Sequence, residues 1–381
     1  MKIAIMTQPL GHNYGGLLQA FALQAYLKSI GCTVVSLDRK PATKPLKKTT
    51  DFTVSLAKRL LGRIKRLPSE KANKYVFFHL IGFKDRYLAM SEPVTTEKQV
   101  RTYFQQNNFD AVIVGSDQVW RPKYSPSLEN YFLDFLDDIG SNAKRISCAA
   151  SFGVSEWEFT EKQTRACKAL LHKFDAISVR EKSAVSLCKE YFEETVEWVI
   201  DPTMLLDVSD YEQLLTDVPS ANKGNVLTYV LDAAEDKQKI AKIVAGTLRK
   251  KAFSVKPEKT LTQVNSSEVD KCQYPKVESW LQGFKDASYV VTDSFHGCVF
   301  SILFNKPFIA IGNRSRGQAR FESLLSMFDL EDRLISTPDE LNEDRIKEAI
   351  DWDRVNQIRM MRAQAGKEFL KNNIFQDGRF E

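Results

Sequence analysis

The first forty residues alternate between strand and helix patterns, and this alternation restricts the chain to a small set of folds. A short apolar run at residues 2–6 leads through a polar loop into residues 15–31, whose apolar side chains form a broad face at helical spacing. A second apolar run follows at residues 32–38. A strand, a helix and a strand in this order predict a βαβ unit, and such a unit requires a parallel sheet.

The same alternation continues along most of the chain, with a break at residues 202–224 where Asp, Ser, Pro and Gly accumulate. We expect further strands at residues 110–115, 143–151, 175–180, 196–201, 225–231, 252–257, 288–293 and 307–312, and helices at residues 161–173, 181–192, 235–250, 277–285 and 295–305. Because a single core rarely grows beyond about 250–300 residues, the 381 residues predict two domains. The expected fold class is α/β, with two doubly wound, Rossmann-like domains facing each other across a cleft.

The break in the pattern also sets the expected domain limits. We place an N-terminal α/β domain at residues 1–205, with a basic excursion at 39–90, and a C-terminal α/β domain at 206–339. Residues 340–381 carry helical patterns of mixed charge, and we expect this tail to pack back on the first domain.

Positive charge is concentrated in one segment. The formal net charge is +5, yet residues 39–74 hold twelve Lys or Arg residues against two acidic ones, so the rest of the chain is acidic. Leucines recur at helical spacing within residues 55–67, so the segment could contact an anionic membrane surface or an anionic glycan. Alternatively, the leucines pack on the domain and the charges are solvated. Nucleic acid is not an expected partner, because the patch has no aromatic platform.

Several site classes lack their sequence signatures here. The six cysteines are scattered without CxxC spacing, which favours reduced, buried thiols of a cytoplasmic protein. Neither a signal peptide nor an apolar run of 18 residues is evident, and the basic segment allows a peripheral position at the inner face of the membrane. HExxH, Cys/His clusters and GxSxG are missing, so we expect no metal ion, no cofactor and no Ser-His-Asp hydrolase.

Polar clusters occur where the expected strands end, and ligands of open α/β sheets bind at the carboxyl ends of the strands. The first cluster is GHNYGG, residues 11–16. Gly15 and Gly16 let the backbone approach a ligand, and the helix that follows offers free N–H groups to an anion. Asn13 is expected either to cap this helix or to contact the ligand.

The second cluster, VGSDQVWRPKY at residues 114–124, follows an apolar strand directly. Ser116 and Asp117 have the character of a site loop, in which Asp117 could accept hydrogen bonds from sugar hydroxyls. A helix cap is the alternative role of Asp117. We expect Trp120 to stack on the face of a sugar ring.

The third and fourth clusters carry a cation and a histidine. Arg180 ends a strand and could hold a carboxylate or phosphate bidentately, although an internal salt bridge with Glu181 or Asp201 fits equally well. In TDSFHG, residues 292–297, Asp293 or Ser294 can cap the next helix. His296 then falls in the first helical turn, facing the cleft, where the helix dipole favours an anion.

Three arginines follow the last strand of the second domain, in the segment NRSRGQARF. Arg314, Arg316 and Arg320 lie within seven residues, with Glu322 as the nearby acidic residue. Such a concentration of guanidinium groups at a strand end indicates a bound anion. The alternative is a solvated loop.

Taken in order, these clusters resemble the polysaccharide pyruvyl transferase family, from residue 1 to about residue 330. The motifs that carry the resemblance are NYGGLLQAFALQ (13–24), VGSDQVWR (114–121), SFG (151–153), ISVREKSAV (177–185), DPTMLL (201–206) and VVTDSFHGCVFSILFNKPFIAIGN (290–313) followed by RFESLL (320–325). The resemblance implies transfer of a pyruvyl group from phosphoenolpyruvate to a sugar of a cell-surface glycan, usually as a cyclic ketal. It also implies a fold similar to that of GT-B glycosyltransferases.

The resemblance assigns roles to individual residues. Arg180 matches the donor-binding arginine of the family's VRD/VRE motif, and Ser294-Phe295-His296 matches its Arg-Leu-His motif. Ser294 replaces an arginine, so the donor lacks one cation, which Arg314, Arg316 or Arg320 could supply.

The chemistry of ketal formation suggests the remaining roles. We expect His296 to act as general acid/base or to donate a proton to the leaving phosphate, because its ordinary pKa is near neutrality. Asp293 is expected to orient His296, and Asp117 to activate the sugar hydroxyl. Two other interpretations remain open: a GT-B glycosyltransferase that uses a nucleotide-sugar, and a non-catalytic homologue that binds a sugar or phosphate.

Overall fold

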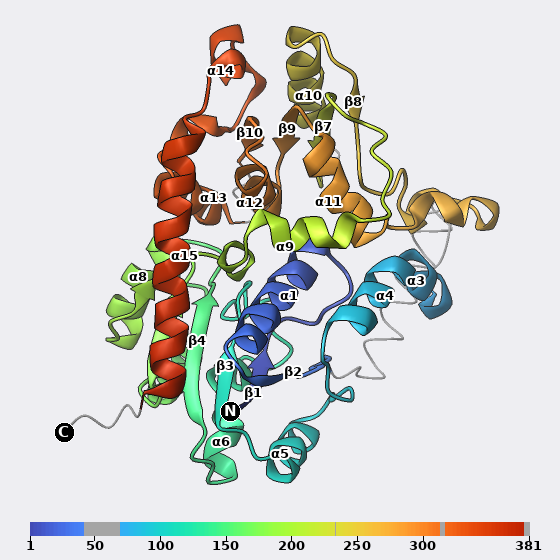
Figure 1. Cartoon of the computed structure of the whole chain (residues 1–381). Coiled ribbons are helices and arrows are strands. Elements are labelled where there is room, and N and C mark those ends of the chain that lie inside the picture. Colours follow the sequence, from blue (N-terminus) through green and yellow to red (C-terminus); the bar gives the residue numbers. More distant parts are fainter. Residues whose placement is uncertain (42–68, 233, 313–316, 377–381) are drawn as a thin grey trace.

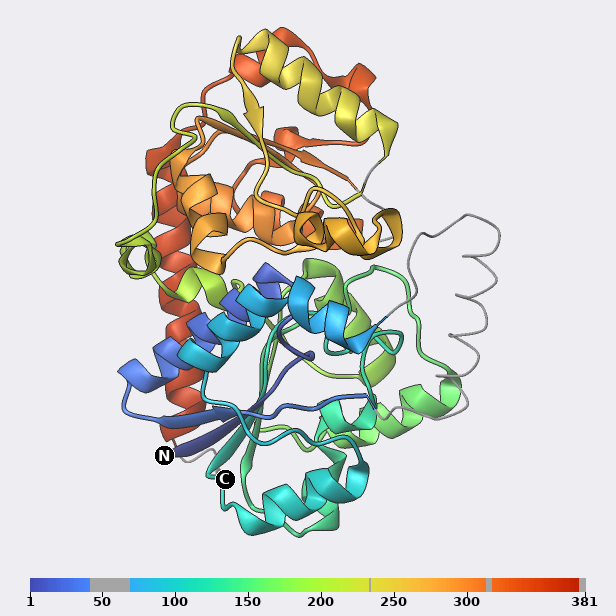
Figure 2. The same ribbon diagram turned by 90° about the vertical axis from the view of Figure 1, so that its right-hand side faces the viewer.

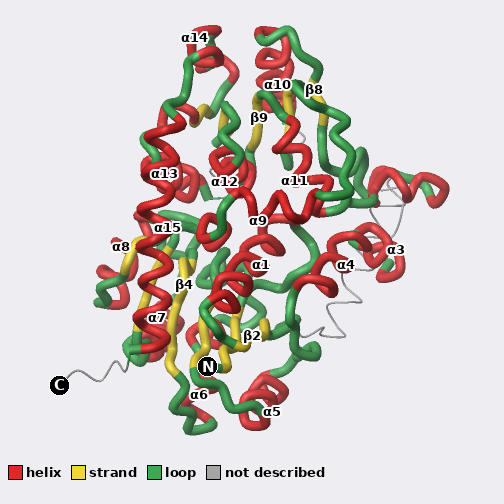
Figure 3. Tube along the Cα trace, in the orientation of Figure 1, coloured by secondary structure: helices red, strands yellow, loops and turns green. Residues whose placement is uncertain are grey.

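A computed structural model of the protein describes residues 1–41, 69–232, 234–312 and 317–376, which form two stacked α/β lobes (Figure 1). Within these residues the first lobe contains a six-stranded sheet, and the second lobe contains a five-stranded sheet. Every described strand pair is parallel, as the alternation of strands and helices predicted. Helices flank the strands in both lobes (Figure 3).

The first sheet has the strand order β2-β1-β3-β4-β5-β6. Its strands are β1 (Lys2–Met6), β2 (Thr33–Ser36), β3 (Ala111–Val114), β4 (Lys144–Ala150), β5 (Ala176–Val179) and β6 (Glu197–Trp198). The helices of this lobe are α1 (Tyr14–Ser29), α3 (Glu70–Val76), α4 (Phe78–Tyr87), α5 (Glu97–Gln106), α6 (Asp134–Asp138), α7 (Glu161–Leu171) and α8 (Lys182–Leu187). Within the described residues, each strand and helix predicted for this lobe is present to within a few residues of its expected limits. The helical pattern at 55–67 lies outside them. Helix α8 passes into a π-helical turn at Cys188–Phe192.

The second sheet has the strand order β11-β10-β9-β7-β8. Its strands are β7 (Val226–Tyr229), β8 (Ala252–Phe253), β9 (Tyr289–Thr292), β10 (Phe308–Ile311) and β11 (Leu334–Ile335). The later helices are α9 (Val208–Glu212), α10 (Glu235–Thr247), α11 (Val277–Asp286), α12 (Phe295–Leu303), α13 (Gln318–Met327), α14 (Glu343–Lys347) and α15 (Trp352–Phe375). We did not predict β11, because Leu334 and Ile335 stand between polar segments, whereas the equally short β6 and β8 lie within longer runs rich in apolar residues.

An apolar core continues from one lobe into the other. The cluster that covers one face of the first sheet includes Leu17 and Leu23 of α1, and it extends to Phe284 and Phe300 of the second lobe. At this junction the ring of Tyr14 stacks on Trp280, with centroids 5.2 Å apart and an interplanar angle of 15°. The first lobe therefore packs against the second through α1 (Figure 2).

Helix α15 runs beside both lobes (Figures 1 and 2). Near its start, Arg354 forms a 2.6 Å ion pair with Asp329 of the second lobe. Farther along, the carbonyl of Lys367 accepts a hydrogen bond of 2.8 Å from the Tyr26 hydroxyl, in the first lobe. The tail thus contacts the first lobe, while the domain limits at residues 205 and 339 stay predictions.

Residues 42–68 of the basic excursion lie outside the described residues, and its remainder includes α3 and α4. Its described first residues include Arg39, whose side chain is buried and pairs with Glu97 at 2.9 Å. Membrane contact through this segment stays a prediction. None of the described helices has both the length and the apolar composition needed to cross a bilayer.

Candidate functional site

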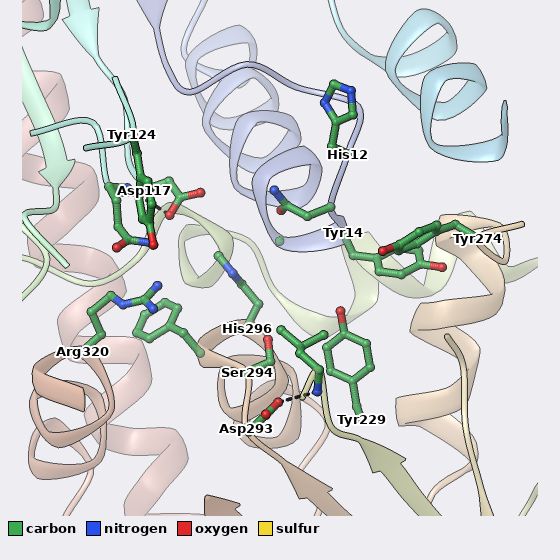
Figure 4. A pocket seen from close by; sticks show the side chains of 15 residues that line it. His12, Tyr14, Asp117, Tyr124, Tyr229, Tyr274, Asp293, Ser294, His296 and Arg320 are labelled. Atoms are coloured by element: carbon green, nitrogen blue, oxygen red, sulfur yellow. Dashed lines mark hydrogen bonds between the residues drawn. The ribbon is translucent and has the colours of Figure 1, made fainter. Parts of the chain in front are cut away.

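A cavity of about 510 Å³ lies between the two sheets, where the loops after β1 and β3 face those after β7 and β9. Figure 4 shows Arg320, Asp117 and Tyr124 at one end, His296 and Ser294 in the middle, and Tyr14, Tyr229 and Tyr274 at the other end. The carboxyl ends of parallel strands thus build the cavity from both lobes, as in other open α/β sheets.

The GHNYGG loop brings the backbone of the first lobe against His296. Asn13 caps α1 by accepting a hydrogen bond from the N–H of Gly16, and it also lines the cavity. A Cβ atom on Gly15 would lie 2.0 Å from His296 Nδ1, so this position accepts no side chain without displacing the imidazole. Gly16 is outside the cavity lining, and its own Cβ would lie 2.9 Å from Asn13 Oδ1.

The TDSFHG segment forms the turn between β9 and α12. The Thr292 hydroxyl donates to the carbonyl of Tyr229 at 2.7 Å and accepts from the N–H of Ser294 at 3.1 Å. Ser294 is the N-cap of α12, since its side chain accepts from the N–H of Gly297 at 3.3 Å. His296 lies in the first turn of α12 and faces the cavity, as the sequence analysis predicted (Figure 4).

Asp293 lines the cavity but does not orient His296, so this expectation was wrong. Its carboxylate accepts hydrogen bonds from the backbone N–H groups of Leu231 (2.6 Å) and Asp232 (3.2 Å). It also forms a 2.6 Å ion pair with Lys237. These partners hold the carboxylate toward the loop after β7, on the opposite side of the chain from the imidazole.

Asp201 is the acidic residue that contacts His296, with Oδ2 3.8 Å from Nε2. Burial lowers the pKa of His296, and the nearby guanidinium groups of Arg180 and Arg320 lower it further, while Asp201 and Asp117 act in the opposite direction. Within the described residues, Nε2 has no hydrogen-bond partner. Burial therefore favours the neutral form of the imidazole in the free protein, and Nε2 is enclosed beside Asp201.

Arg180 lies behind the cavity wall in a buried ion pair. Its Nη1 donates to Asp201 Oδ2 at 2.9 Å, and its Nη2 lies 3.6 Å from Asp117 Oδ1. The internal salt bridge, one of the two interpretations from the sequence, is thus formed. The guanidinium also lies over the ring of Phe295, 4.3 Å from the centroid, so it contributes positive charge from behind that ring.

Arg320 supplies a cation directly to the cavity lining. It lies in the first turn of α13, is buried, and has its guanidinium 5.8 Å from the Phe295 centroid. Burial and the neighbouring Arg180 lower the pKa of Arg320 to about 10, so the group remains charged at neutral pH. Arg314 and Arg316 lie outside the described residues.

Some residues of the loop after β3 line the cavity, and others are buried in the core. Asp117 lines the cavity at a backbone φ of +73°. No described helix begins directly after Asp117, so the helix-cap alternative was wrong. Ser116 is fully buried and donates to Asp201 Oδ2 at 3.3 Å, and it is outside the cavity lining.

Trp120 does not reach the cavity, and the expected stacking on a sugar was wrong. The side chain is fully buried, its Nε1 donates to the carbonyl of Tyr131 at 2.9 Å, and its ring stacks on Phe132 at 5.2 Å. Four residues later, Tyr124 lines the cavity and is 43% exposed. The turn after Asp117 directs the tryptophan into the core and leaves the tyrosine at the surface.

Sequence reasoning missed the aromatic end of the cavity. Tyr14, Tyr229 and Tyr274 line it, and their rings form a continuous group with Trp280. Tyr14 stands within the GHNYGG motif, and Tyr229 lies within the strand predicted at residues 225–231, so both positions carried a signal. Tyr274 follows a 3₁₀-helix at Ser266–Cys272, where no sequence pattern indicated a site.

No metal centre is evident in the described part of the chain, where His, Cys, Asp and Glu side chains form no group of three or more that could hold an ion. The cations at one end of the cavity suit an anion, and the aromatic rings at the other end suit the face of a sugar or another flat ring.

Comparisons with known proteins agree with this architecture. The sequence model of the polysaccharide pyruvyl transferase family matches residues 13–315. No curated protein sequence matches the chain.

Several solved structures are similar to this protein over nearly the whole chain. Arabidopsis thaliana UGT89C1 complexed with UDP-L-rhamnose is similar over 98% of this chain and 97% of its own, with 10% identity and a TM-score of 0.53. The glycotransferase of kitacinnamycin is similar over 97% of each chain, with 13% identity and a TM-score of 0.52. A putative UDP-N-acetylglucosamine 2-epimerase from Listeria monocytogenes is similar over 100% and 99%, with 14% identity and a TM-score of 0.51. Identities this low show the fold alone, and they confirm the expected GT-B-like architecture.

Proposed function

Since the chain belongs to the polysaccharide pyruvyl transferase family, we propose that it transfers the pyruvyl group of phosphoenolpyruvate to a sugar of a cell-surface polysaccharide or its lipid-linked precursor, as a ketal. The observation that carries this proposal is the buried Arg320 in the same cavity as His296. A buried cation attracts an anionic donor strongly, because little water screens its charge. A titratable imidazole in the same cavity can supply the proton transfer that the reaction needs.

The donor carries a carboxylate and a phosphate, and the Arg320 end of the cavity offers three sources of positive potential. Arg320 lines this end, and Arg180 lies behind the ring of Phe295. The third source is the N-terminus of α12, where Ser294 is the cap. Arg320 would then replace the arginine that the family carries at the position of Ser294.

The reaction needs a proton at the donor's methylene carbon and removal of protons from two sugar hydroxyls. A bound anion favours the protonated imidazole, so His296 takes up a proton as the donor binds and gives it to C3, and the C2=C3 electron pair forms the new C–H bond. The first hydroxyl adds to C2, and the C2–O bond to phosphate breaks. The second hydroxyl then closes the ketal. Of the two hydroxyl protons, one restores His296 and the other leaves with hydrogen phosphate.

Asp117 is the group that we assign to the sugar hydroxyl. It lines the cavity on the loop after β3, at the same end as Arg320 (Figure 4). Its Oδ1 accepts from the N–H of Gln118 at 2.9 Å and lies 3.6 Å from Arg180 Nη2. These two contacts hold the carboxylate in a fixed direction, so it can take the proton of the first hydroxyl as that hydroxyl adds to C2 and pass the proton to the departing phosphate.

Ligand binding tests this proposal before any acceptor is known. Phosphoenolpyruvate at roughly a hundred times its Kd should add about 2.7 kcal/mol to the unfolding free energy. Inorganic phosphate should stabilise less, because it lacks the carboxylate. Stabilisation by a nucleotide-sugar but not by phosphoenolpyruvate would contradict the proposal.

A nucleotide-sugar glycosyltransferase is the second candidate, and the aromatic end of the cavity is the observation in its favour. Tyr229 and Tyr274 belong to the second lobe, and their rings could stack on a nucleotide base. The same stability measurements with UDP-sugars as ligands separate this candidate from the first.

A further inference from the structure

A side chamber of about 260 Å³ opens beside the aromatic end of the cavity. The two spaces share Tyr229, Leu231 and Tyr274 as lining residues, so they are adjacent along one wall. In Figure 4, Tyr229 and Tyr274 lie on the side of His296 that faces away from Arg320. The chamber therefore extends the cavity away from the end assigned to the donor.

Both lobes contribute aromatic side chains to the chamber. Phe77, at the junction of α3 and α4, lies against Tyr274 of the second lobe, with ring centroids 5.0 Å apart and an interplanar angle of 32°. Tyr274 in turn contacts Tyr14 at 5.9 Å, at the boundary with the main cavity. Phe77 and Tyr274 are both half-buried, so part of their surface is available to a ligand. Aromatic rings of this kind bind the apolar faces of sugar rings.

The chamber also contains a cation that is held in place. Lys256 lines it, is half-buried, and donates a hydrogen bond from Nζ to the carbonyl of Val230. An ammonium group has three N–H donors, so Lys256 can also donate to a ligand oxygen. Lys259, which lines the chamber as well, forms a 3.1 Å ion pair with Glu268. Among the residues that line the chamber, Lys256 is therefore the cation that we assign to a negative charge on a ligand.

We propose that the side chamber binds the sugar unit bonded to the one that receives the pyruvyl group, and that this second unit carries an anionic group recognised by Lys256. The inference rests on the proposed function and adds the class of acceptor: an oligosaccharide of at least two units, the second one acidic. A carboxylate of a uronic acid and a phosphate ester present the same anionic oxygens, and the experiment separates them.

The experiment compares kcat/KM of the full chain for a series of acceptors, with phosphoenolpyruvate saturating. The series consists of a methyl pyranoside with a 4,6-diol, a neutral disaccharide containing that unit, and two disaccharides whose second unit bears a carboxylate or a phosphate monoester. The reacting unit is taken from galactosides, mannosides and N-acetylhexosaminides, whichever is pyruvylated. At least one acidic disaccharide should exceed the neutral one by roughly tenfold, the effect expected of a hydrogen bond to a charged group. Equal values for the monosaccharide and all disaccharides would overturn the inference.

Two variants assign the preference to the chamber. Lys256→Met should bring the ratio of acidic to neutral disaccharide close to one, whereas Lys250→Met, which removes the same charge at an exposed position, should keep the wild-type ratio. Phe77→Leu keeps an apolar side chain, removes the ring, and should lower kcat/KM for both kinds of disaccharide by roughly threefold to tenfold. An unchanged ratio in Lys256→Met together with an unchanged value in Phe77→Leu would overturn the inference.

The outcomes distinguish the inference from the function on which it rests. Pyruvyl transfer without preference among acceptors overturns the inference alone. Absence of transfer to every acceptor overturns the proposed function and the inference together. UDP binding that is lost in Phe77→Leu would assign the chamber to a nucleotide and would also overturn the inference.

Discussion

His296 occupies a position where its protonation state depends on what the cavity contains. Its imidazole is buried between Asp201 and the backbone of Gly15, and two guanidinium groups lie close enough to oppose its protonation. An anionic donor would reverse this effect, because a nearby negative charge favours the imidazolium. In the proposed reaction, His296 would therefore gain and lose a proton in each turnover.

The lowered pKa of His296 predicts a pH dependence of stability. Because this pKa in the folded state lies below the ordinary value of 6.5, the unfolded chain binds the proton more readily, and the unfolding free energy falls as the pH falls below 6.5. His296→Gln removes this contribution, which amounts to at most about 1.4 kcal/mol per pH unit. Urea unfolding at pH 7.5 and pH 5.5 should show a smaller acid loss in the variant. An equal loss in both proteins would contradict the assignment, because every other residue is common to the two proteins.

Arg320 should determine donor affinity. Arg320→Met removes a buried cation from the cavity and should raise the KM for phosphoenolpyruvate by about 10–100-fold, the loss expected for a charge-assisted hydrogen bond. Arg165→Met is the matched control, because Arg165 is an arginine whose side chain is 75% exposed on α7. A donor KM within a few-fold of wild type in Arg320→Met would remove Arg320 from the donor site.

The sequence predicted which residues surround the cavity better than it predicted the role of each residue. His296, Ser294, Asn13 and Asp117 all line the cavity, because each lies in the loop or first helical turn that follows the carboxyl end of a strand. Asp201 entered the sequence analysis as an alternative partner of Arg180, and the structure makes it the carboxylate nearest to His296. The difference between Asp201 and Asp293 depends on side-chain direction, which a linear pattern does not encode.

The loops at the strand ends determine how closely the two lobes meet. The first turn of α1 lies against the first turn of α12 at Gly15, where a methyl group would overlap the imidazole. Gly317, at a φ of +93°, meets the carbonyl of Gly153 in the same manner, since its Cβ would lie 1.7 Å from that oxygen. Elements from both lobes thus approach to backbone contact beside the cavity.

Gly15→Ala tests this contact. The added Cβ would displace His296, and a misplacement of about 1 Å can lower kcat by roughly 100-fold. Gly246→Ala in α10 is the matched control, because a Cβ there meets no atom within 4 Å, and it should change the unfolding free energy by no more than about 1 kcal/mol. Unaltered kcat in Gly15→Ala would show that the imidazole position is not critical.

Strands and helices whose apolar residues recur with a clear period were predictable from the sequence, whereas irregular segments were not. The strands and helices around the cavity follow apolar runs and helical spacing in the sequence. Trp120 and Tyr124 lie in an irregular turn after Asp117, where no period indicates which side chain enters the core. Tyr274 is brought to the cavity by the packing of an irregular segment, so it depends on tertiary structure.

The whole molecule is held together by a core shared between the lobes and by a helix that runs along both. The end of α15 packs on the first lobe, where Leu370 and Ile374 are fully buried. Gly366 allows this approach, since its Cβ would lie 3.0 Å from Leu205 Cδ2. The helical pattern in residues 340–381 predicted this helix. The structure identifies the residues through which it packs on the first lobe.

Removing an apolar contact of α15 should destabilise the whole fold. Leu370→Ala deletes a fully buried side chain and should lower the unfolding free energy by about 2–5 kcal/mol. Met361→Ala, at a position 65% exposed on the same helix, should stay within about 0.5 kcal/mol of wild type. Chemical unfolding measures both. Equal effects of the two substitutions would contradict the packing of this helix.

The central claim is that this two-lobed fold converts phosphoenolpyruvate and a sugar diol into a ketal and phosphate. The most direct test offers the enzyme phosphoenolpyruvate with a panel of pyranoside acceptors. Phosphorus and proton nuclear magnetic resonance then follow the formation of hydrogen phosphate and of the ketal. We expect signals from hydrogen phosphate and from the ketal methyl group in equimolar amounts. We also expect kcat to be lower by about 10²–10⁴-fold in His296→Ala. Phosphate release without a ketal signal, no reaction with any acceptor, or a His296→Ala rate within a few-fold of wild type would contradict it.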